Sequence, residues 1–189
     1  MHKIAASLVG VALVALQTAC ADRQSPTPPT APREDATTQL SIDGGSDKLV
    51  SLLDACDPAS FSAVGAPCAR PGGRPFDQFL AEVISTHQAG GWQIAPSPIE
   101  ARVGQRLVVV NRGGEFHTFT EVEHYADGSI NAGLNHVLGD PDVAPECKSP
   151  SVELVPSGGT HTETVDEEGT ELYQCCIHPW MRATVVAKR

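Results

Sequence analysis

The second half of the chain carries short apolar runs separated by turn residues. These runs span 101–103, 106–111, 117–122, 152–155, 160–165, 172–175 and 183–186. Short strands at this spacing, with no helical periodicity between them, are typical of an antiparallel β-sandwich or barrel. We therefore predict an all-β domain over residues 92–189.

The preceding segment, residues 41–91, has a different pattern. A helix-like apolar cluster is formed by Leu49, Val50, Leu52 and Leu53. A second set follows the spacing i, i+3, i+4, i+7, i+8 of an amphipathic helix and consists of Phe76, Phe79, Leu80, Val83 and Ile84. Gly90 and Gly91 are expected to end that helix. We predict a helical extension packed on the main domain, with His87 on the polar side of its helix rather than on a metal.

The N-terminus reads as a targeting segment. After Lys3, an apolar run of about 13 residues is too short to span a bilayer but suits a secretory signal. The sequence Leu16–Cys20 resembles a bacterial lipobox, which implies a signal over 1–20 and a lipid anchor on Cys20. An alternative is ordinary cleavage at the small residues Ala19-Cys20-Ala21. Residues 21–40 are rich in Pro and Thr and predict a flexible tether. Both alternatives imply an exported protein, periplasmic or on the outer surface of the cell envelope.

Composition and charge argue against some classes of function. The 189 residues support one domain with extensions, and the net charge is −10. Nucleic-acid binding depends on cationic contacts to phosphate, so an acidic chain is a poor candidate for it. The same charge favours a basic protein partner.

One loop carries the most specific chemistry. Cys175, His178 and Met181 follow one another at intervals of three residues between two predicted strands. Thiolate, imidazole and thioether together suit copper, which cycles between Cu(I) and Cu(II). A blue copper site needs a second imidazole in the plane, and His117 at the start of an upstream strand is the natural supplier.

These residues resemble the cupredoxin family, in particular its amicyanin and plastocyanin-like members. The likeness rests on Cys-x-x-His-Pro-x-Met-Arg at 175–182, on Asn-Arg-x-x-x-x-His at 111–117 and on the hairpin residues 156–173. It covers 92–189 and implies a Greek-key sandwich holding one type 1 copper ion on His117, Cys175, His178 and Met181. An insertion at about 123–150 and the segment 41–91 depart from the family pattern.

The resemblance also implies how electrons leave the centre. The C-terminal ligand histidine of cupredoxins lies at the surface, so His178 should expose its ring edge. Pro179 and Trp180 would then form an apolar docking patch for a redox partner. Residues 92–189 contain 14 acidic and 7 basic side chains, a net charge of −7, which favours a basic partner such as a small cytochrome.

The adjacent cysteines 175 and 176 need different roles. Successive strand residues point to opposite faces, so Cys175 shares a face with Tyr173 and Cys176 does not. Only Cys175 gives the Cys-x-x-His spacing of the family and is taken as the ligand. Disulfides are the default for the remaining cysteines of an exported protein, and we favour Cys56–Cys68 and Cys147–Cys176. Sequence alone does not determine this pairing.

Several alternatives stay open. Glu115 is an alternative to Met181 as a ligand. A second metal site at His124 and His136 is less favoured than a solvated loop, and His161 is expected at the surface. A copper chaperone or store, a cupredoxin domain without a redox role and a structural adhesin-like module compete with a single-electron carrier. An enzyme is disfavoured, since four protein ligands leave no open position and no second copper site is seen. The leading interpretation is a monomeric blue copper electron carrier.

Overall fold

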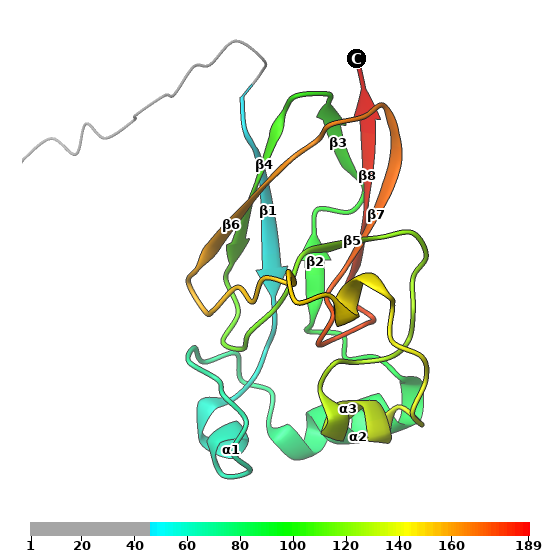
Figure 1. Cartoon of the computed structure of the whole chain (residues 1–189). Coiled ribbons are helices and arrows are strands. Elements are labelled where there is room, and N and C mark those ends of the chain that lie inside the picture. The colour runs from blue at the N-terminus through cyan, green and yellow to red at the C-terminus, as the bar shows by residue number, and fades with distance from the viewer. Residues whose placement is uncertain (1–45) are drawn as a thin grey trace, which may run out of the picture. The chain divides into compact units, whose positions relative to one another are not determined.

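The computed structural model describes residues 46–189, so the predicted signal (1–20) and tether (21–40) lie outside the described residues. Two four-stranded sheets make up the body of the domain (Figure 1). One has the order β2-β1-β4-β6, formed by β1 (Lys48–Leu53), β2 (Gln93–Ala95), β4 (Arg106–Asn111) and β6 (Thr160–Thr164). The other has the order β3-β8-β7-β5, formed by β3 (Ile99–Arg102), β5 (Thr120–Val122), β7 (Gly169–Gln174) and β8 (Arg182–Lys188). The predicted β-sandwich is confirmed.

Both sheets are mixed, which corrects the prediction that the strands are all antiparallel. β1 runs parallel to β4, and β3 runs parallel to β8, while the other neighbouring strands are antiparallel. A parallel pair cannot be joined by a tight hairpin and needs a long crossover. The segments between β1 and β4 and between β3 and β8 supply these crossovers.

The apolar cluster at residues 49–53 is a strand rather than a helix. Val50 and Leu52 point into the core and are fully buried. β1 lies between β2 and β4, so the sandwich begins here and not at residue 92. The predicted helical extension is therefore wrong for the first part of the segment 41–91. Four to six apolar residues fit a helix turn and a strand equally well, and only the pairing with β4 decides between them.

Strands β4 and β8 alternate buried and partly buried side chains. In β4 the buried positions are Leu107, Val109 and Asn111, and in β8 they are Ala183, Val185 and Ala187. The run at 152–155 was expected to be a strand, but its pairing is limited to a single bridge between Val155 and His117. That bridge fixes the backbone of His117 next to residue 155.

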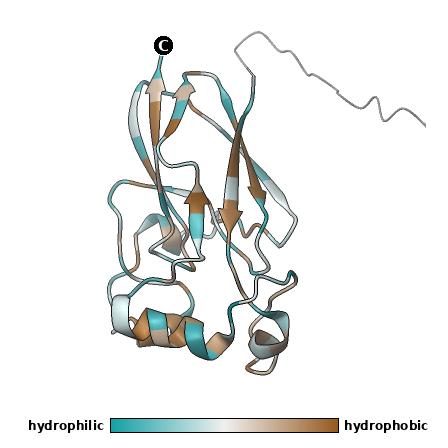
Figure 2. Cartoon of the chain, turned by 180° about the vertical axis from the view of Figure 1, so that it is seen from behind, coloured by the Kyte–Doolittle hydropathy of each residue, from teal (hydrophilic) through white to brown (hydrophobic). Residues whose placement is uncertain are grey.

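Three α-helices, α1 (Pro58–Ser62), α2 (Phe76–Thr86) and α3 (Ala132–Val137), gather at one end of the sandwich, where the chain also passes from β7 to β8 (Figure 1). The amphipathic helix predicted from residue 76 is confirmed as α2, with Phe79 and Val83 buried, and its ribbon carries hydrophobic and hydrophilic residues in alternation (Figure 2). It ends before Gly90 because His87 takes a left-handed conformation with φ of 57°. Within residues 46–189 no helix combines the length and the apolar character needed to cross a membrane.

Both predicted disulfides are present, Cys56–Cys68 and Cys147–Cys176. Cys147 belongs to the short 3-10 helix η1 (Glu146–Lys148), inside the 123–150 insertion. The insertion is also hydrogen-bonded to the loop after β7, through Ile130 N–H to the carbonyl of Cys176 (2.9 Å) and Ser129 Oγ to the carbonyl of Ile177 (2.6 Å). The added segment is thereby fastened to the loop that carries the predicted ligands.

Candidate metal centre

His117, Cys175 and His178 come together at the helical end of the sandwich. The Cys175 Sγ atom lies 3.8 Å from His117 Nδ1 and 3.9 Å from His178 Nδ1. The two Nδ1 atoms are 3.3 Å apart. All three side chains are buried, with at most 2% of their surface exposed. The ligand atoms of these residues face a common point, as three ligands of one metal ion would.

Met181 closes the loop that carries two of these residues. Its N–H donates to the carbonyl of His178 (2.9 Å), and its own carbonyl accepts from the N–H of Cys175 (3.0 Å). The Met181 side chain is fully buried and belongs to the same core cluster as Cys175. Its role as the axial ligand stays a prediction.

The two adjacent cysteines lie on opposite sides of the chain, as strand parity predicts, while the choice of Cys175 as the ligand stays a prediction. Cys175 packs into the main core with Tyr173 and is the free cysteine of the described residues. Cys176 lies in a separate cluster, bonded to Cys147. The Sγ atom of Cys175 accepts the N–H groups of Thr118 (3.4 Å) and His178 (3.5 Å). Such contacts stabilise negative charge on the sulfur.

A buried carboxylate that sequence reasoning missed lies behind His117. The Nε2 atom of His117 is 2.8 Å from Oδ2 of Asp54, and the two side chains are 0% and 1% exposed. Asp54 follows β1 directly and also accepts the N–H groups of Gly114 and Glu115, each at 2.9 Å. Asp54 could have been found as the first polar residue after an apolar strand. It was missed because residues 49–53 were predicted to be helical.

This ion pair sets the charge state of the centre without metal. Burial raises the pKa of Asp54, but the hydrogen bonds from His117 and from the two backbone N–H groups outweigh it and bring the pKa to about 2. Burial lowers the pKa of His117, yet Asp54 and the Cys175 sulfur raise it to about 9. Burial also raises the pKa of Cys175, but His117 and His178 hold it well below its usual range. The two histidines thus favour the thiolate of Cys175, the form in which a cysteine binds a metal.

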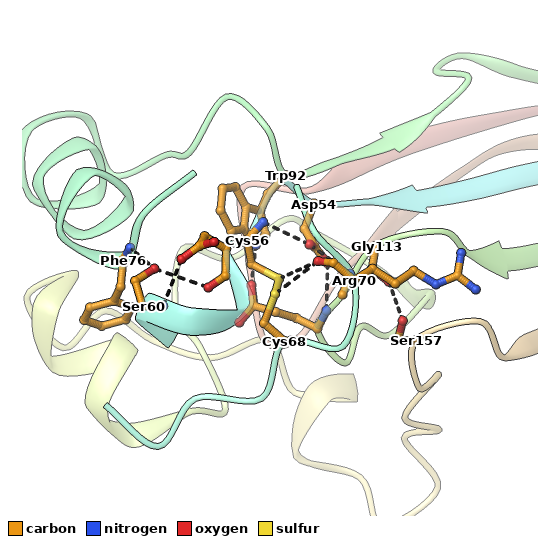
Figure 3. Close-up of a disulfide and its surroundings, with 12 residues drawn as sticks. Asp54, Cys56, Ser60, Cys68, Arg70, Phe76, Trp92, Gly113 and Ser157 are labelled. Atoms are coloured by element: carbon orange, nitrogen blue, oxygen red, sulfur yellow. Dashed lines mark hydrogen bonds between the residues drawn. A yellow bond between two sulfur atoms is a disulfide. The ribbon is translucent and has the colours of Figure 1, made fainter. Parts of the chain in front are cut away.

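Asp54 is held by its neighbours in the fold. The Cys56–Cys68 disulfide follows it on the chain, and Gly113 lies beside it (Figure 3). A Cβ atom on Gly113 would collide with the Asp54 carboxylate, and one on Gly114 would lie 2.6 Å from the Cys56 sulfur. The absence of side chains at Gly113 and Gly114 is what lets this loop approach the carboxylate.

His178 is not at the surface, and this corrects the predicted docking patch. The residue is 2% exposed, Pro179 is buried and Trp180 is half-buried. The ring of His178 is covered by Trp92 and Trp180, with ring centres 6.4 and 5.5 Å away. Trp92 lies just before β2, and Trp180 lies in the loop between β7 and β8. No local sequence pattern indicates that these two distant residues meet over His178.

Glu115 lies outside the ring of ligand atoms. Its Oε2 atom is 3.6 Å from Nε2 of His178, on the side of the imidazole that faces away from Cys175. The same oxygen accepts the indole N–H of Trp92 at 2.6 Å. Burial raises the pKa of Glu115, although the electrostatic interaction with His178 and the hydrogen bond from Trp92 oppose the shift. Glu115 thus contacts the back of one ligand histidine, as Asp54 contacts the back of the other.

The other histidines do not form a second metal cluster within residues 46–189. His136 pairs with Asp140 (3.1 Å) on the exposed side of α3, and His124 is exposed. His161 is less exposed than expected, at 17% of its side chain, because it lies between Glu153 and Glu163.

Neither a family model nor a curated protein matches the chain. Among solved structures, it is similar to a purple cupredoxin from Nitrosopumilus maritimus, with 14% identity over 75% of this chain and all of that one and a TM-score of 0.42. Two amicyanin variants in the Cu(I) state are 20% and 21% identical and cover 51% and 53% of this chain and 73% and 77% of their own, with TM-scores of 0.35 and 0.36. Likenesses of this strength do not assign a family. The described residues themselves establish a buried cluster of two histidines and one cysteine at the helical end of a β-sandwich.

Proposed function

We propose that the protein is a cupredoxin-like type 1 copper protein that carries single electrons. One copper ion would be held by His117, Cys175 and His178, with Met181 as a weak axial ligand. When bound, copper supplies a one-electron couple between Cu(I) and Cu(II). The protein's part is to hold the ligands in a fixed, dry arrangement through both oxidation states.

The observation that carries this proposal is the convergence of one free thiol and two Nδ1 atoms in a buried pocket. Two imidazoles and a thiolate are the donor set of blue copper sites. The His117 ring is fixed by Asp54, and the Cys175 sulfur by two N–H groups. Ligands held from outside in this way lose little freedom when a metal binds.

Carrier function is favoured over catalysis and storage for two reasons. Three buried ligands and an axial thioether leave no coordination position for a substrate, whereas catalytic metal sites keep one open. The described residues contain one such cluster, while a copper store needs capacity for several ions.

Copper titration of the metal-free full-length protein tests the proposal. We expect one equivalent of Cu(II) to produce an intense blue colour that a reductant bleaches and an oxidant restores, whereas Zn(II) gives a colourless complex. A colourless copper complex, or one that cannot be reoxidised, would contradict the electron-carrier assignment. Uptake of several Cu(I) ions without reversible colour would favour a store.

We also propose that the protein works outside the cytoplasm, lipid-anchored through Cys20. The two disulfides support an oxidising compartment, where such bonds persist. Cells fed a labelled fatty acid should label the wild-type protein but not Cys20→Ser. Unlabelled wild-type protein released in soluble form would instead support cleavage at Ala19-Cys20-Ala21.

A further inference from the structure

The segment 68–74 covers backbone that holds Asp54 in place. The N–H of Ala69 donates to the carbonyl of Gly114 at 2.8 Å. A Cβ atom added to Gly114 would lie 2.9 Å from the backbone of Arg70, so these two stretches of chain are in direct contact. Gly114 in turn donates its N–H to the Asp54 carboxylate at 2.9 Å. A displacement of 68–74 would therefore disturb one of the groups that fix this carboxylate.

The Cys56–Cys68 disulfide ties this segment to the other side of Asp54. Cys56 follows Asp54 by two residues, and its N–H donates to Asp54 Oδ1 at 3.3 Å. The disulfide joins Cys56 to the start of 68–74 (Figure 3). The carbonyl of Cys56 also accepts the N–H of Gly72 at 2.8 Å. Asp54 thus lies between two stretches of chain that one covalent bond fastens together.

The two disulfides differ in how a reductant could reach them. Cys147 and Cys176 are 4% and 0% exposed, so the bond between them is enclosed. Cys56 is also 0% exposed, but Cys68 is partly exposed and precedes two exposed residues, 69 and 70. A disulfide opens when a thiolate attacks one of its sulfur atoms, and the rate depends on access to that sulfur. Of the four bonded cysteines, Cys68 is the one that offers such access in the folded protein.

We propose that the Cys56–Cys68 disulfide is a redox switch, opened by a dithiol reductant, that sets how firmly Asp54 holds His117. A thiolate of the dithiol attacks the Cys68 sulfur, and the Cys56–Cys68 bond breaks with Cys56 as the leaving thiolate. The second thiol of the dithiol then attacks the mixed disulfide and releases Cys68. Two electrons pass to the protein, the dithiol becomes a disulfide, and its two protons end on Cys56 and Cys68.

Opening the bond releases the segment 68–74 from its covalent hold. The contact with Gly114 then rests on hydrogen bonds alone, and Asp54 loses the rigid enclosure that keeps its carboxylate on His117 Nε2 at 2.8 Å. The effect on Asp54 is independent of any metal. The further effect on copper rests on the proposed function, because an outer hydrogen bond on a ligand histidine contributes to metal affinity.

Reduction of the metal-free full-length protein tests which bond opens. Samples treated with dithiothreitol, a small dithiol, are alkylated at successive times, and the labelled cysteines are located by peptide mass spectrometry. Because the rate depends on access, Cys56 and Cys68 should acquire label at least about tenfold faster than Cys147 and Cys176. Equal rates for the two pairs, or faster opening of Cys147–Cys176, would overturn the proposal.

Amide hydrogen exchange of the same metal-free protein shows whether the opened bond loosens Asp54. The N–H groups of Gly114 and Glu115 donate to its carboxylate and should exchange at least about tenfold faster after reduction. The N–H of Ile130, which donates to the carbonyl beside the other disulfide, is the matched control and should keep its rate. Unchanged exchange at Gly114 and Glu115 in the reduced protein would contradict the switch.

The double variant Cys56→Ser/Cys68→Ser carries the test to copper without adding thiols that bind the metal themselves. Its copper affinity should fall, by up to the roughly 10- to 100-fold that loss of a ligand's outer hydrogen bond costs. Wild-type affinity in a folded double variant would refute the link from the disulfide to His117. Since the exchange measurement uses the wild-type chain, it decides the matter even if the variant does not fold. A wild-type protein that takes up no copper, but shows the faster exchange, would overturn the copper assignment and leave the switch in place.

Discussion

The two ligand histidines differ in what lies behind them. His117 is backed by a fully ionised carboxylate at hydrogen-bonding distance, while His178 faces the more weakly placed Glu115 at 3.6 Å. A carboxylate on the outer nitrogen fixes which ring nitrogen points at the metal and increases its basicity. In the proposed copper site, Asp54 would therefore be a positioning residue that acts on the metal through His117.

Copper affinity should depend on pH through this pair. The His117 pKa of about 9 means that the metal-free ring carries a proton at neutral pH, and copper binding must expel it from Nδ1. The affinity should thus rise about tenfold per pH unit below about pH 9, where one proton is released. In Asp54→Asn the pKa of His117 falls, so the affinity should level off at a lower pH and the reduction potential should shift.

Competition with a chelator at several pH values measures this dependence. Asp77→Asn, an exposed change on α2, is the matched control and should behave like the wild type. An affinity that is flat from about pH 6 to pH 8 in the wild type would show that His117 is not protonated in the metal-free protein.

The sulfur atoms provide a second test at this scale. Cys175→Ser should abolish the blue colour because the colour needs a thiolate on copper, whereas Cys176→Ser should keep it and lose only the bond to Cys147. Absorption spectra of both copper-loaded variants decide the point. A blue Cys175→Ser protein would mean that another residue supplies the ligand sulfur.

Met181 should tune the copper rather than hold it. Met181→Leu removes the thioether but keeps an apolar side chain of similar volume in a fully buried position. We expect one copper per protein as before, with a changed reduction potential, measured by voltammetry. Complete loss of copper binding would give Met181 a larger role than an axial ligand.

At the scale of elements, the loop between β4 and His117 must come close to the end of β1. Asn111 holds this loop with its side chain, donating to the carbonyls of Glu115 (2.7 Å) and Val155 (2.8 Å). Gly113 then passes the Asp54 carboxylate with no room for a side chain. The loop and the strand end form one unit that positions His117.

Gly113→Ala should therefore damage both stability and the centre. Overpacking of this kind costs about 1–3 kcal/mol, and Asp54 must move away from His117 to make room. Gly133→Ala in α3 is the matched control, because an added Cβ there makes only an ordinary contact with Asn131 Oδ1 at 3.5 Å, and it should be neutral or slightly stabilising. Urea unfolding and copper affinity of the two variants measure the difference. A wild-type copper affinity in Gly113→Ala would contradict the role given to this loop.

Much of the sandwich was accessible from the sequence, because strands such as β4 and β8 alternate regularly and the Cys175–Met181 spacing is specific. The predictions that failed concern features that depend on contacts between residues far apart in the sequence. The run 49–53 becomes a strand only through pairing with residues 107–111, so Asp54 at its end could not be placed. The burial of His178 depends on Trp92, 86 positions earlier in the chain. Neither contact produces a periodic pattern of apolar residues in the sequence around it.

At the scale of the whole molecule, the negative net charge is the property that we expect to attract a partner protein. The excess of acidic residues over 92–189 predicts attraction to a basic redox protein, which we propose as the partner class. The buried His178 leaves no ligand edge exposed for contact, so long-range attraction rather than a ligand-centred patch should govern the encounter.

The association rate with a basic cytochrome should consequently fall as ionic strength rises, because salt screens the charges. Stopped-flow mixing of the reduced copper protein with the oxidised cytochrome measures this rate. An acidic cytochrome is the matched comparison and should show the opposite trend. A rate that does not change with salt for both partners would exclude electrostatic steering.

The parallel pairing of β1 with β4 and of β3 with β8 also has a consequence for when the centre can form. Ile99 is aligned with Val185, and Lys48 with Leu107, so the sheets are closed by contacts between distant parts of the chain. Topologies of high contact order fold slowly, because the chain loses entropy in closing long loops before the contacts between distant residues can stabilise it. Asp54 directly follows the first strand, and Cys175 and His178 lie in the loop before the last strand. A chain that lacks the final strand therefore lacks the pairing that closes the second sheet, so we expect metal capture to follow the docking of that strand.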